Sequence, residues 1–151
     1  MTRLKFKPLL MVMSIALLLA ACASSLTMSN DERSIAYAEY IVKEKLESMD
    51  RITAFRFYGF SALSDDNVII STRLNRPYLI TLQSNCFNIW HANAIRINNT
   101  GSSLKVKFDS LSVPQQSGMA TKCFIKTIHK LTVEQKKTLL KIGKKVEEDE
   151  A

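Results

Sequence analysis

Two cysteine–histidine pairs are the residues whose types and spacing could support chemistry in this sequence. Four residues separate Cys86 from His91, and five separate Cys123 from His129. These are the ligand types of a Cys2His2 zinc site, and a cysteine beside a histidine can also act as a nucleophile with its base. An extended chain would place Cys123 and His129 about 20 Å apart, so both could hold one metal only across a sharp bend. We therefore expect no metal and no other cofactor, although free thiols would reopen both alternatives.

The third cysteine, Cys22, ends an N-terminal segment that has the pattern of an export signal. The first eight residues contain three basic side chains and no acid, and residues 9–19 are almost wholly apolar. A basic start followed by a short apolar run is typical of a signal peptide, and this run is shorter than the roughly 20 residues of a membrane span. A buried core helix is the alternative interpretation.

The residues Leu19, Ala20, Ala21 and Cys22 resemble the lipobox of bacterial lipoproteins. The resemblance implies a signal peptide over residues 1–21, acylation of Cys22 by chains such as palmitate, and attachment to a membrane through these chains. By the same analogy Ala23, a residue other than aspartate, implies the outer membrane, with the protein facing the periplasm. An ordinary signal cleaved near Ala23 is the alternative.

Lipidation of Cys22 would leave Cys86 and Cys123 as a pair in an oxidising compartment. Two such cysteines most simply form one disulfide, which would close a loop of about 38 residues and stabilise the fold by roughly 4 kcal/mol in the chain-entropy model. Without residues 1–21 the chain has 130 residues, enough for a domain with its own core, and 18 basic against 14 acidic residues. This small excess, without a basic block, argues against nucleic acid as a partner.

Two amphipathic helices are predicted on either side of a β region. Ser29 and Glu32 have the spacing of a capping box before a helix over residues 30–48, and Thr132 and Gln135 repeat that spacing near the C-terminus. Apolar side chains then recur every three or four positions. Those expected on the buried face of the first helix are Ile35, Ala38, Val42, Leu46 and Met49. Those expected on the second are Leu139, Leu140, Ile142 and Val146. The acidic end, residues 147–150, is expected to fray.

Between the helices the apolar pattern changes to that of short strands separated by turns. The predicted strands cover residues 53–60, 67–72, 77–83, 94–98, 103–108 and 122–128, and residues 111–113 would continue the fifth of these strands or add another. Phe55 and Phe57 would share one face of the first strand. The fourth and fifth strands would form a hairpin, with Leu104, Val106 and Phe108 alternating with lysines. Residues 87–93 are too irregular to assign.

This order of elements predicts an α+β fold. The sheet would be a small antiparallel sheet or partly open barrel of about six strands, with an N-terminal and a C-terminal amphipathic helix packed at one side. Residues 22–29 would be a tether, residues 30–131 a single α+β domain, and residues 132–151 the C-terminal helix and acidic tail.

Several short motifs of the β region occur in a recognisable order. They are Asp65-Asp66 before Val68-Ile69-Ile70, Tyr78-Leu79-Ile80-Thr81-Leu82 before Cys86, Ala92-Asn93-Ala94-Ile95, Asp109-Ser110-Leu111-Ser112-Val113, and Cys123-Phe124-Ile125 with Ile128. Over residues 52–131 the chain thereby resembles a family of small exported proteobacterial proteins, many with lipoprotein leaders, that has no assigned activity. The resemblance implies the fold and the cysteine pair and no catalytic residue. Members often have a tryptophan in the first strand, whereas Trp90 of this chain follows the first paired cysteine.

No catalytic constellation stands out in the sequence. Asp65, Asp66 and Asn67 could supply paired carboxylates, but between two strands such residues commonly form turns. The leading interpretation is a non-catalytic binding or structural module of the bacterial envelope, with an envelope protein or peptidoglycan as partner. The alternative is a small periplasmic hydrolase or other ligand-modifying enzyme. The residues expected to face a ligand in either case are Tyr78, Trp90, His91 and Asp109.

Overall fold

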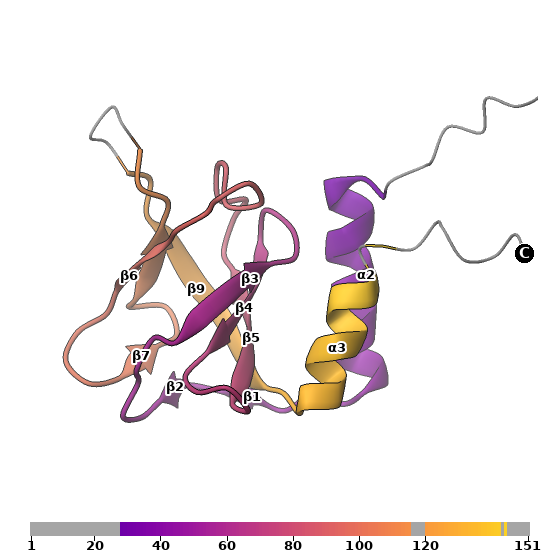
Figure 1. Cartoon of the computed structure of the whole chain (residues 1–151), viewed down its shortest axis with the longest axis horizontal. Helices are drawn as coiled ribbons and strands as arrows, with labels where there is room; N and C mark the ends of the chain where they lie inside the picture. Colours follow the sequence, from indigo (N-terminus) through magenta and orange to yellow (C-terminus); the bar gives the residue numbers. More distant parts are fainter. Residues whose placement is uncertain (1–27, 116–119, 143, 145–151) are drawn as a thin grey trace, which may run out of the picture. The chain divides into compact units, whose positions relative to one another are not determined.

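An antiparallel β-sheet is the main element of the computed structural model (Figure 1). The structure describes residues 28–115, 120–142 and 144, which fall within one compact unit of the chain, Thr27–Lys145. Its elements in chain order are α2 (Asn30–Lys43), β1 (Ser48–Met49), β2 (Arg51–Ile52), β3 (Gly59–Ala62), β4 (Asn67–Ser71), β5 (Pro77–Leu82), β6 (Arg96–Asn98), β7 (Leu104–Lys105), β8 (Ser110–Ser112), β9 (Cys123–Lys130) and α3 (Val133–Ile142).

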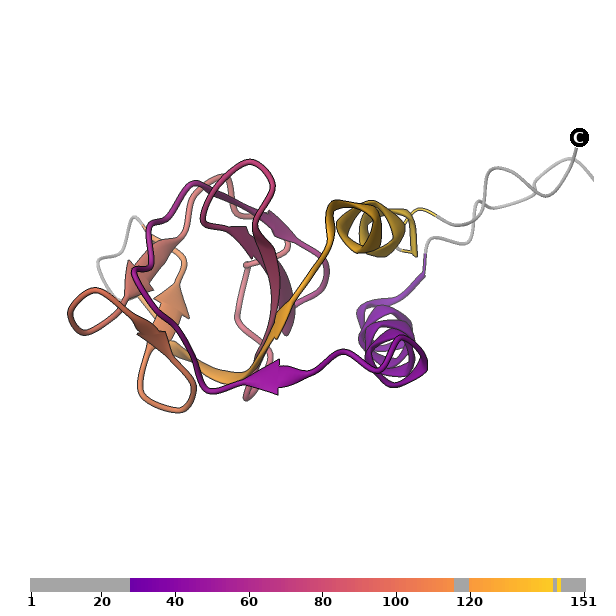
Figure 2. The same cartoon turned by 90° about the horizontal axis from the view of Figure 1, so that it is seen from below.

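The main sheet has the strand order β3-β4-β5-β9-β8-β6, with β1 also paired to β9. A separate two-stranded sheet joins β2 to β7. The register between β5 and β9 shifts between Thr81 and Leu82, and such a bulge increases the local bend and twist of a sheet. Figure 2 shows the main sheet curling round on itself. The predicted small antiparallel sheet or partly open barrel is thus confirmed as a curled half-barrel.

The central strands β4 and β5 are buried on both faces. Val68, Ile70 and Ile80 belong to one hydrophobic cluster, whereas their neighbours Ile69 and Leu79 belong to another. Side chains of a strand point alternately to its two faces, so a strand with a cluster on each face needs apolar residues in succession. This explains why these two strands read as continuous apolar runs and were located correctly from the sequence.

Helix α2 begins at the predicted capping box. The backbone N–H of Glu32 donates to the Ser29 hydroxyl at 3.3 Å, and the Ser29 N–H donates to the Glu32 carboxylate at 2.7 Å. The helix ends at Lys43 rather than at residue 48, because Lys45 adopts a left-handed backbone (φ 50°). The chain can then leave the helix axis and pair with β9 as β1.

The predicted buried face is wrong within α2, whereas Leu46 and Met49, which follow the helix, pack against the two clusters. Ile35 is 60% exposed and Val42 is 77% exposed, whereas Arg33 and Tyr37 are buried. Tyr37 is in the cluster between the helices and the sheet, and its hydroxyl donates to the Leu63 carbonyl at 3.4 Å. The apolar bodies of arginine and tyrosine can line a buried helix face, so counting only aliphatic residues selects the opposite side of this helix.

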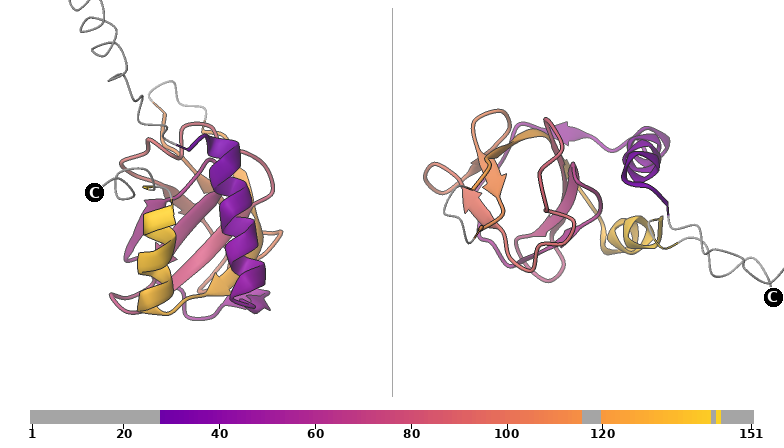
Figure 3. Two further views of the ribbon diagram at one scale, coloured as in Figure 1. Left: turned by 90° about the vertical axis from the view of Figure 1, so that its right-hand side faces the viewer. Right: turned by 90° about the horizontal axis from the view of Figure 1, so that it is seen from above.

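Helix α3 also begins at its capping box, with the Gln135 N–H donating to the Thr132 hydroxyl at 3.1 Å. Leu139 is fully buried, and Leu140 and Ile142 pack against the same cluster as Tyr37. Figure 3 shows α2 and α3 side by side over one face of the sheet. No helix within the described ranges is long and apolar enough to cross a membrane. Val146 and the acidic tail, for which packing and fraying were predicted, lie outside the described residues.

The predicted first strand, residues 53–60, is shorter than expected. Only Gly59 and Phe60 of this segment are in β3, which continues to residue 62. Ala54 has a φ of 49°, a left-handed conformation that interrupts an extended strand. Phe55 packs partly against the inner cluster while Phe57 is 45% exposed, so these two phenylalanines do not share an inward face.

The predicted hairpin between residues 94–98 and 103–108 is wrong. Strand β6 pairs with β8, and β7 pairs instead with β2. A turn replaces the second half of the expected strand: Lys107 has a φ of 67°, and the buried Asp109 carboxylate accepts the Lys105 N–H at 2.6 Å and the Thr100 N–H at 3.2 Å. Phe108, expected to point inward, is 79% exposed on this turn.

Candidate ligand-binding site

The predicted disulfide between Cys86 and Cys123 is present, with Cα atoms 5.6 Å apart. Both cysteines are buried in the cluster inside the half-barrel, so the bond ties the segment after β5 to the start of β9. A cysteine in a disulfide offers no thiolate to a metal or a substrate. Among the residues that the structure describes, no group of three or more histidine, cysteine, aspartate or glutamate side chains is placed to hold a metal ion.

The two histidines lie in different surroundings. His129 on β9 is 5% exposed, and its Nδ1 lies 3.1 Å from the Leu46 carbonyl and 3.2 Å from that of Glu47. It therefore links β9 to the segment that leads into β1. His91 is exposed at the surface. Only His91 is available to a ligand from solvent.

The segment after Cys86 is a succession of tight turns. The Ile89 N–H donates to the Cys86 carbonyl at 3.1 Å, and the His91 N–H donates to the Asn88 carbonyl at 3.3 Å. Asn88 has a φ of 61°, a conformation that asparagine tolerates better than most residues. Ile89 is fully buried, so this segment, which the sequence left unassigned, is anchored at Cys86 and Ile89 and presents the residues between and after them.

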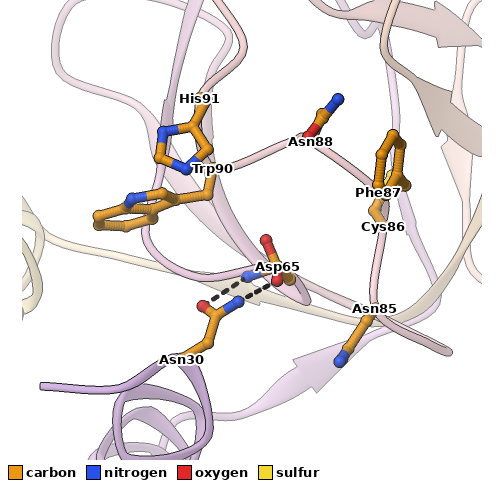
Figure 4. Close-up of a pocket in the computed structure, with 8 residues that line it drawn as sticks. All are labelled: Asn30, Asp65, Asn85, Cys86, Phe87, Asn88, Trp90 and His91. Atoms are coloured by element: carbon orange, nitrogen blue, oxygen red, sulfur yellow. Dashed lines mark hydrogen bonds between the residues drawn. The ribbon is translucent and has the colours of Figure 1, made fainter.

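These turns form one wall of a pocket of about 330 Å³ (Figure 4). Its lining residues are Asn30, Asp65, Asn85, Cys86, Phe87, Asn88, Trp90 and His91. The volume is within the range of small-molecule sites, roughly 300 to 1,000 Å³. The pocket lies where the first turn of α2, the β3–β4 turn and the segment after β5 meet.

The side of the pocket nearest α2 is held by a reciprocal pair of hydrogen bonds. The Asp65 N–H donates to the Asn30 side-chain oxygen at 3.1 Å, and the Asn30 amide donates back to the Asp65 carboxylate. The Asp65 carbonyl also accepts the Cys86 N–H at 2.7 Å. Asp65 therefore connects the helix, the turn and the disulfide, and its carboxylate is already engaged.

The neighbouring carboxylate, Asp66, is engaged as well. It accepts hydrogen bonds from the Ser34 hydroxyl at 2.5 Å, the Ser64 hydroxyl at 2.7 Å and the Asn67 amide at 2.8 Å. These bonds close the turn between β3 and β4 and join it to α2. The geometry favours the turn role of Asp65, Asp66 and Asn67 over paired catalytic carboxylates.

Arg33 of α2 lies against the indole ring of Trp90. The guanidinium carbon of Arg33 lies 4.0 Å from the centre of the indole ring, a cation–π contact. Arg33 is only 9% exposed, and its Nε donates to the Met28 carbonyl at 3.1 Å. The contact fixes the orientation of the only tryptophan in the chain.

The structure brings together two of the four residues predicted to face a ligand. Trp90 and His91 line the pocket. Tyr78 is 8% exposed and belongs to the cluster inside the half-barrel, and Asp109 is 1% exposed and holds the turn after β7. Neither of these two lines the pocket, so the four residues do not form one site.

Asn30 and Arg33 were not anticipated as part of a site, and Asp65 was considered only as a turn residue or one of a pair of carboxylates. Asn30 and Asp65 are 35 positions apart in the chain, and nothing in the local sequence of either indicates the pairing. A weak signal existed for Arg33, which lies one helical turn before Tyr37 on the same face of α2. Recognising Tyr37 as the buried residue of this helix would have placed Arg33 on the inward side.

A second pocket, of about 430 Å³, adjoins the first. Its lining residues are Asn88, His91, Ala92, Asn93, Ala94, Val113 and Pro114. Asn88 and His91 line both pockets. The two pockets therefore share a rim and extend along the same segment.

The chain was compared with known proteins. A family model described as a family of unknown function (DUF6491) matches residues 5–146. No curated protein and no solved structure matches the chain. The matched range is wider than residues 52–131, over which the motifs resemble a family without assigned activity, and it includes both α2 and α3.

Proposed function

Because the chain belongs to this family of unknown function, we propose a function from its own residues: a lipoprotein of the bacterial envelope that binds a ligand, without catalysis, in the pocket beside Trp90. The leader pattern supports the envelope part of the proposal. Cys22 lies outside the described residues, and its acylation is part of the proposal.

The single observation that carries the binding function is a rigid frame that presents free polar groups. The side chains of Asn85, Asn88 and His91 form no hydrogen bond with another described residue. Around them, the disulfide and the Asn30–Asp65 pair fix the backbone. A site whose backbone is already ordered loses less conformational entropy when a ligand binds.

The hydrolase alternative has less support from the geometry. It needs Tyr78, Trp90, His91 and Asp109 around one ligand, and two of these are buried elsewhere. His91 has no partnered nucleophile among the described lining residues, since Cys86 is bonded to Cys123. A binding function requires neither partner.

Anchoring would place the pocket close to the membrane. The predicted tether, residues 22–29, can span at most about 28 Å when fully extended. Several acyl chains on Cys22 would give stable attachment, whereas a single chain gives only marginal attachment. The proposed location is the periplasmic face of the outer membrane, with peptidoglycan or an envelope protein as the source of the ligand.

Two measurements test the proposal. Intact mass of the exported protein should show a chain that starts at an acylated Cys22, and Cys22→Ser should release it from the membrane fraction. A photo-crosslinking residue at position 88 should capture an envelope component in living cells, whereas the same residue at position 75, exposed in the β4–β5 turn, should not. A Cys22→Ser protein that stays acylated and bound, or equal capture at both positions, would contradict it.

A further inference from the structure

We infer that the pocket binds a neutral saccharide chain, with a sugar ring against Trp90 and sugar hydroxyl groups bonded to Asn85, Asn88 and His91. This inference rests on the proposed binding function and names its ligand class. Figure 4 shows the residues that carry it: the rings of Trp90 and Phe87 at two sides of the view, and the side chains of Asn85, Asn88 and His91 on the same segment.

The first argument is the pair of aromatic rings. Phe87 is 64% exposed although it follows the buried Cys86, and Trp90 is half-buried. An aromatic face is apolar and carries negative partial charge, so it accepts the C–H face of a sugar ring. Arg33 holds the indole in place, which leaves the ring ordered before any ligand arrives.

The second argument is the type of polar group. The amide of asparagine offers two donors and an acceptor, and a neutral imidazole offers one donor and one acceptor. A sugar hydroxyl likewise donates and accepts. Asn85, Asn88 and His91 are exposed, so each of them bonds to water when the pocket is empty. Sugar hydroxyl groups can replace this water and keep the three side chains hydrogen-bonded.

The third argument is charge. None of the described residues that line either pocket is a lysine or arginine, so a phosphate or carboxylate would lack the permanently charged partners that bidentate anion sites use. The one acidic residue of the lining, Asp65, is bonded to Asn30. The lining therefore suits a ligand without net charge at the contact.

The fourth argument is length. The second pocket shares Asn88 and His91 with the first and adds Asn93 and the apolar Val113 and Pro114. Two adjoining pockets along one segment accommodate successive rings of a polymer. An oligosaccharide should therefore bind more tightly than its single sugar.

Trp90 provides a direct test, because it is the only tryptophan of the chain. The full protein, in a detergent without a sugar head group, would be titrated with N-acetylglucosamine, its tetramer and maltotetraose while tryptophan fluorescence is recorded. We expect a saturable change, with a Kd on the order of 1 mM for the single sugar, as expected for so small a ligand. At least one tetramer should bind about tenfold more tightly, since a second pocket is filled.

Variants locate the contact. Asn88→Gly removes the amide while keeping the left-handed backbone accessible, and it should weaken tetramer binding at least tenfold. Trp90→Ala, followed by calorimetry, should do the same. The matched controls are Phe108→Ala, an exposed phenylalanine on the turn after β7, and Asn75→Gly. Circular dichroism identifies any variant that has lost its fold, and such a variant is replaced by Asn85→Ala.

The outcomes separate this inference from the proposed function. No fluorescence or calorimetric response at roughly 20 mM of any of the three saccharides, far above the expected Kd, overturns the saccharide inference. If position 88 still crosslinks an envelope component in cells, the binding function remains and its ligand is of another class. If binding occurs and both control variants weaken it as much as Asn88→Gly, the site has been misplaced.

Discussion

The sheet separates two hydrophobic clusters that are held together in different ways. The barrel cluster, inside the curl, gathers side chains from the strands and contains both members of the disulfide. The helix-side cluster consists of Tyr37, Leu63, Ile69, Leu79, Leu131 and Leu139, with no covalent link between its elements. The barrel cluster is thus crosslinked by the disulfide, whereas the helix-side cluster is held by the packing of α2 and α3 against the sheet.

The pocket depends on both clusters. The wall formed by the turns from Asn85 to His91 is anchored in the barrel cluster through Cys86 and Ile89. The side nearest α2 includes Asn30, and Arg33 of the same helix contacts Trp90. Tyr37 anchors this helix in the helix-side cluster. A substitution that destabilises either cluster should therefore also perturb the pocket, and the variants below compare the contributions of the two clusters.

The largest effect is expected from opening the disulfide. Cys86→Ser removes a crosslink between residues 37 positions apart, which should lower the free energy of unfolding by about 4 kcal/mol in the chain-entropy model. Denaturant unfolding of the oxidised protein and the variant would measure it. Reductant should destabilise the parent protein by a similar amount and leave Cys86→Ser unchanged. Two reactive thiols in the unreduced, denatured parent would show that the bond does not form.

The helix-side cluster should respond nearly as strongly to the loss of one side chain. Leu139 is fully buried, and Leu139→Ala should cost about 3 kcal/mol through lost contacts and a residual cavity. The control is Ile35→Ala on the outer side of α2, 60% exposed, where less than about 0.5 kcal/mol is expected. Comparable losses for the two variants in denaturant unfolding would refute the helix orientation described here.

A smaller effect should follow from Arg33→Gln. The substitution removes the cation–π contact with Trp90 and should cost about 1 kcal/mol. Because Trp90 is the only tryptophan, its emission and its acrylamide quenching should change while far-ultraviolet circular dichroism stays the same. Unchanged emission would mean that α2 does not position the indole, and the link between the two clusters at the pocket would be lost.

The smallest expected effect is confined to alkaline pH. Burial raises the pKa of Tyr37 above 10, and the nearby Arg33 partly opposes this. A raised pKa in the folded state means that the contribution of Tyr37 is fully present below the unfolded pKa and is lost as the pH rises through the folded value. Stability should therefore fall above about pH 10, and Tyr37→Phe should flatten that limb. An identical alkaline limb in Tyr37→Phe would assign the fall to other groups.

Features that depend on residues close together in the chain were predicted correctly from the sequence. The capping boxes at Ser29 and Thr132 satisfy helix N–H groups within four residues, and both are present. The strands around Ile69 and Leu79 were located because burial on both faces needs continuous apolar residues. Trp90 and His91 were placed in one site, since they are neighbours in the chain.

Pairings between distant segments could not be predicted in the same way. Strand β7 pairs with β2, some fifty residues earlier in the chain, because the Asp109 carboxylate converts the following residues into a turn rather than a continuing strand. The bond between Asn30 and Asp65 likewise crosses from α2 to the β3–β4 turn. Neither a period nor a spacing in the sequence encodes such contacts, and the second of them holds the side of the pocket nearest α2.

The position of Cys86 also makes the order of the pocket depend on disulfide formation. The cysteine immediately precedes the turns that carry Phe87, Asn88, Trp90 and His91. A newly made chain with free thiols lacks the covalent anchor of these turns, so its pocket is less ordered than that of the oxidised chain. Under the proposed function, oxidation would therefore be a maturation step, because a reduced chain has the pocket residues without the covalent link that anchors them.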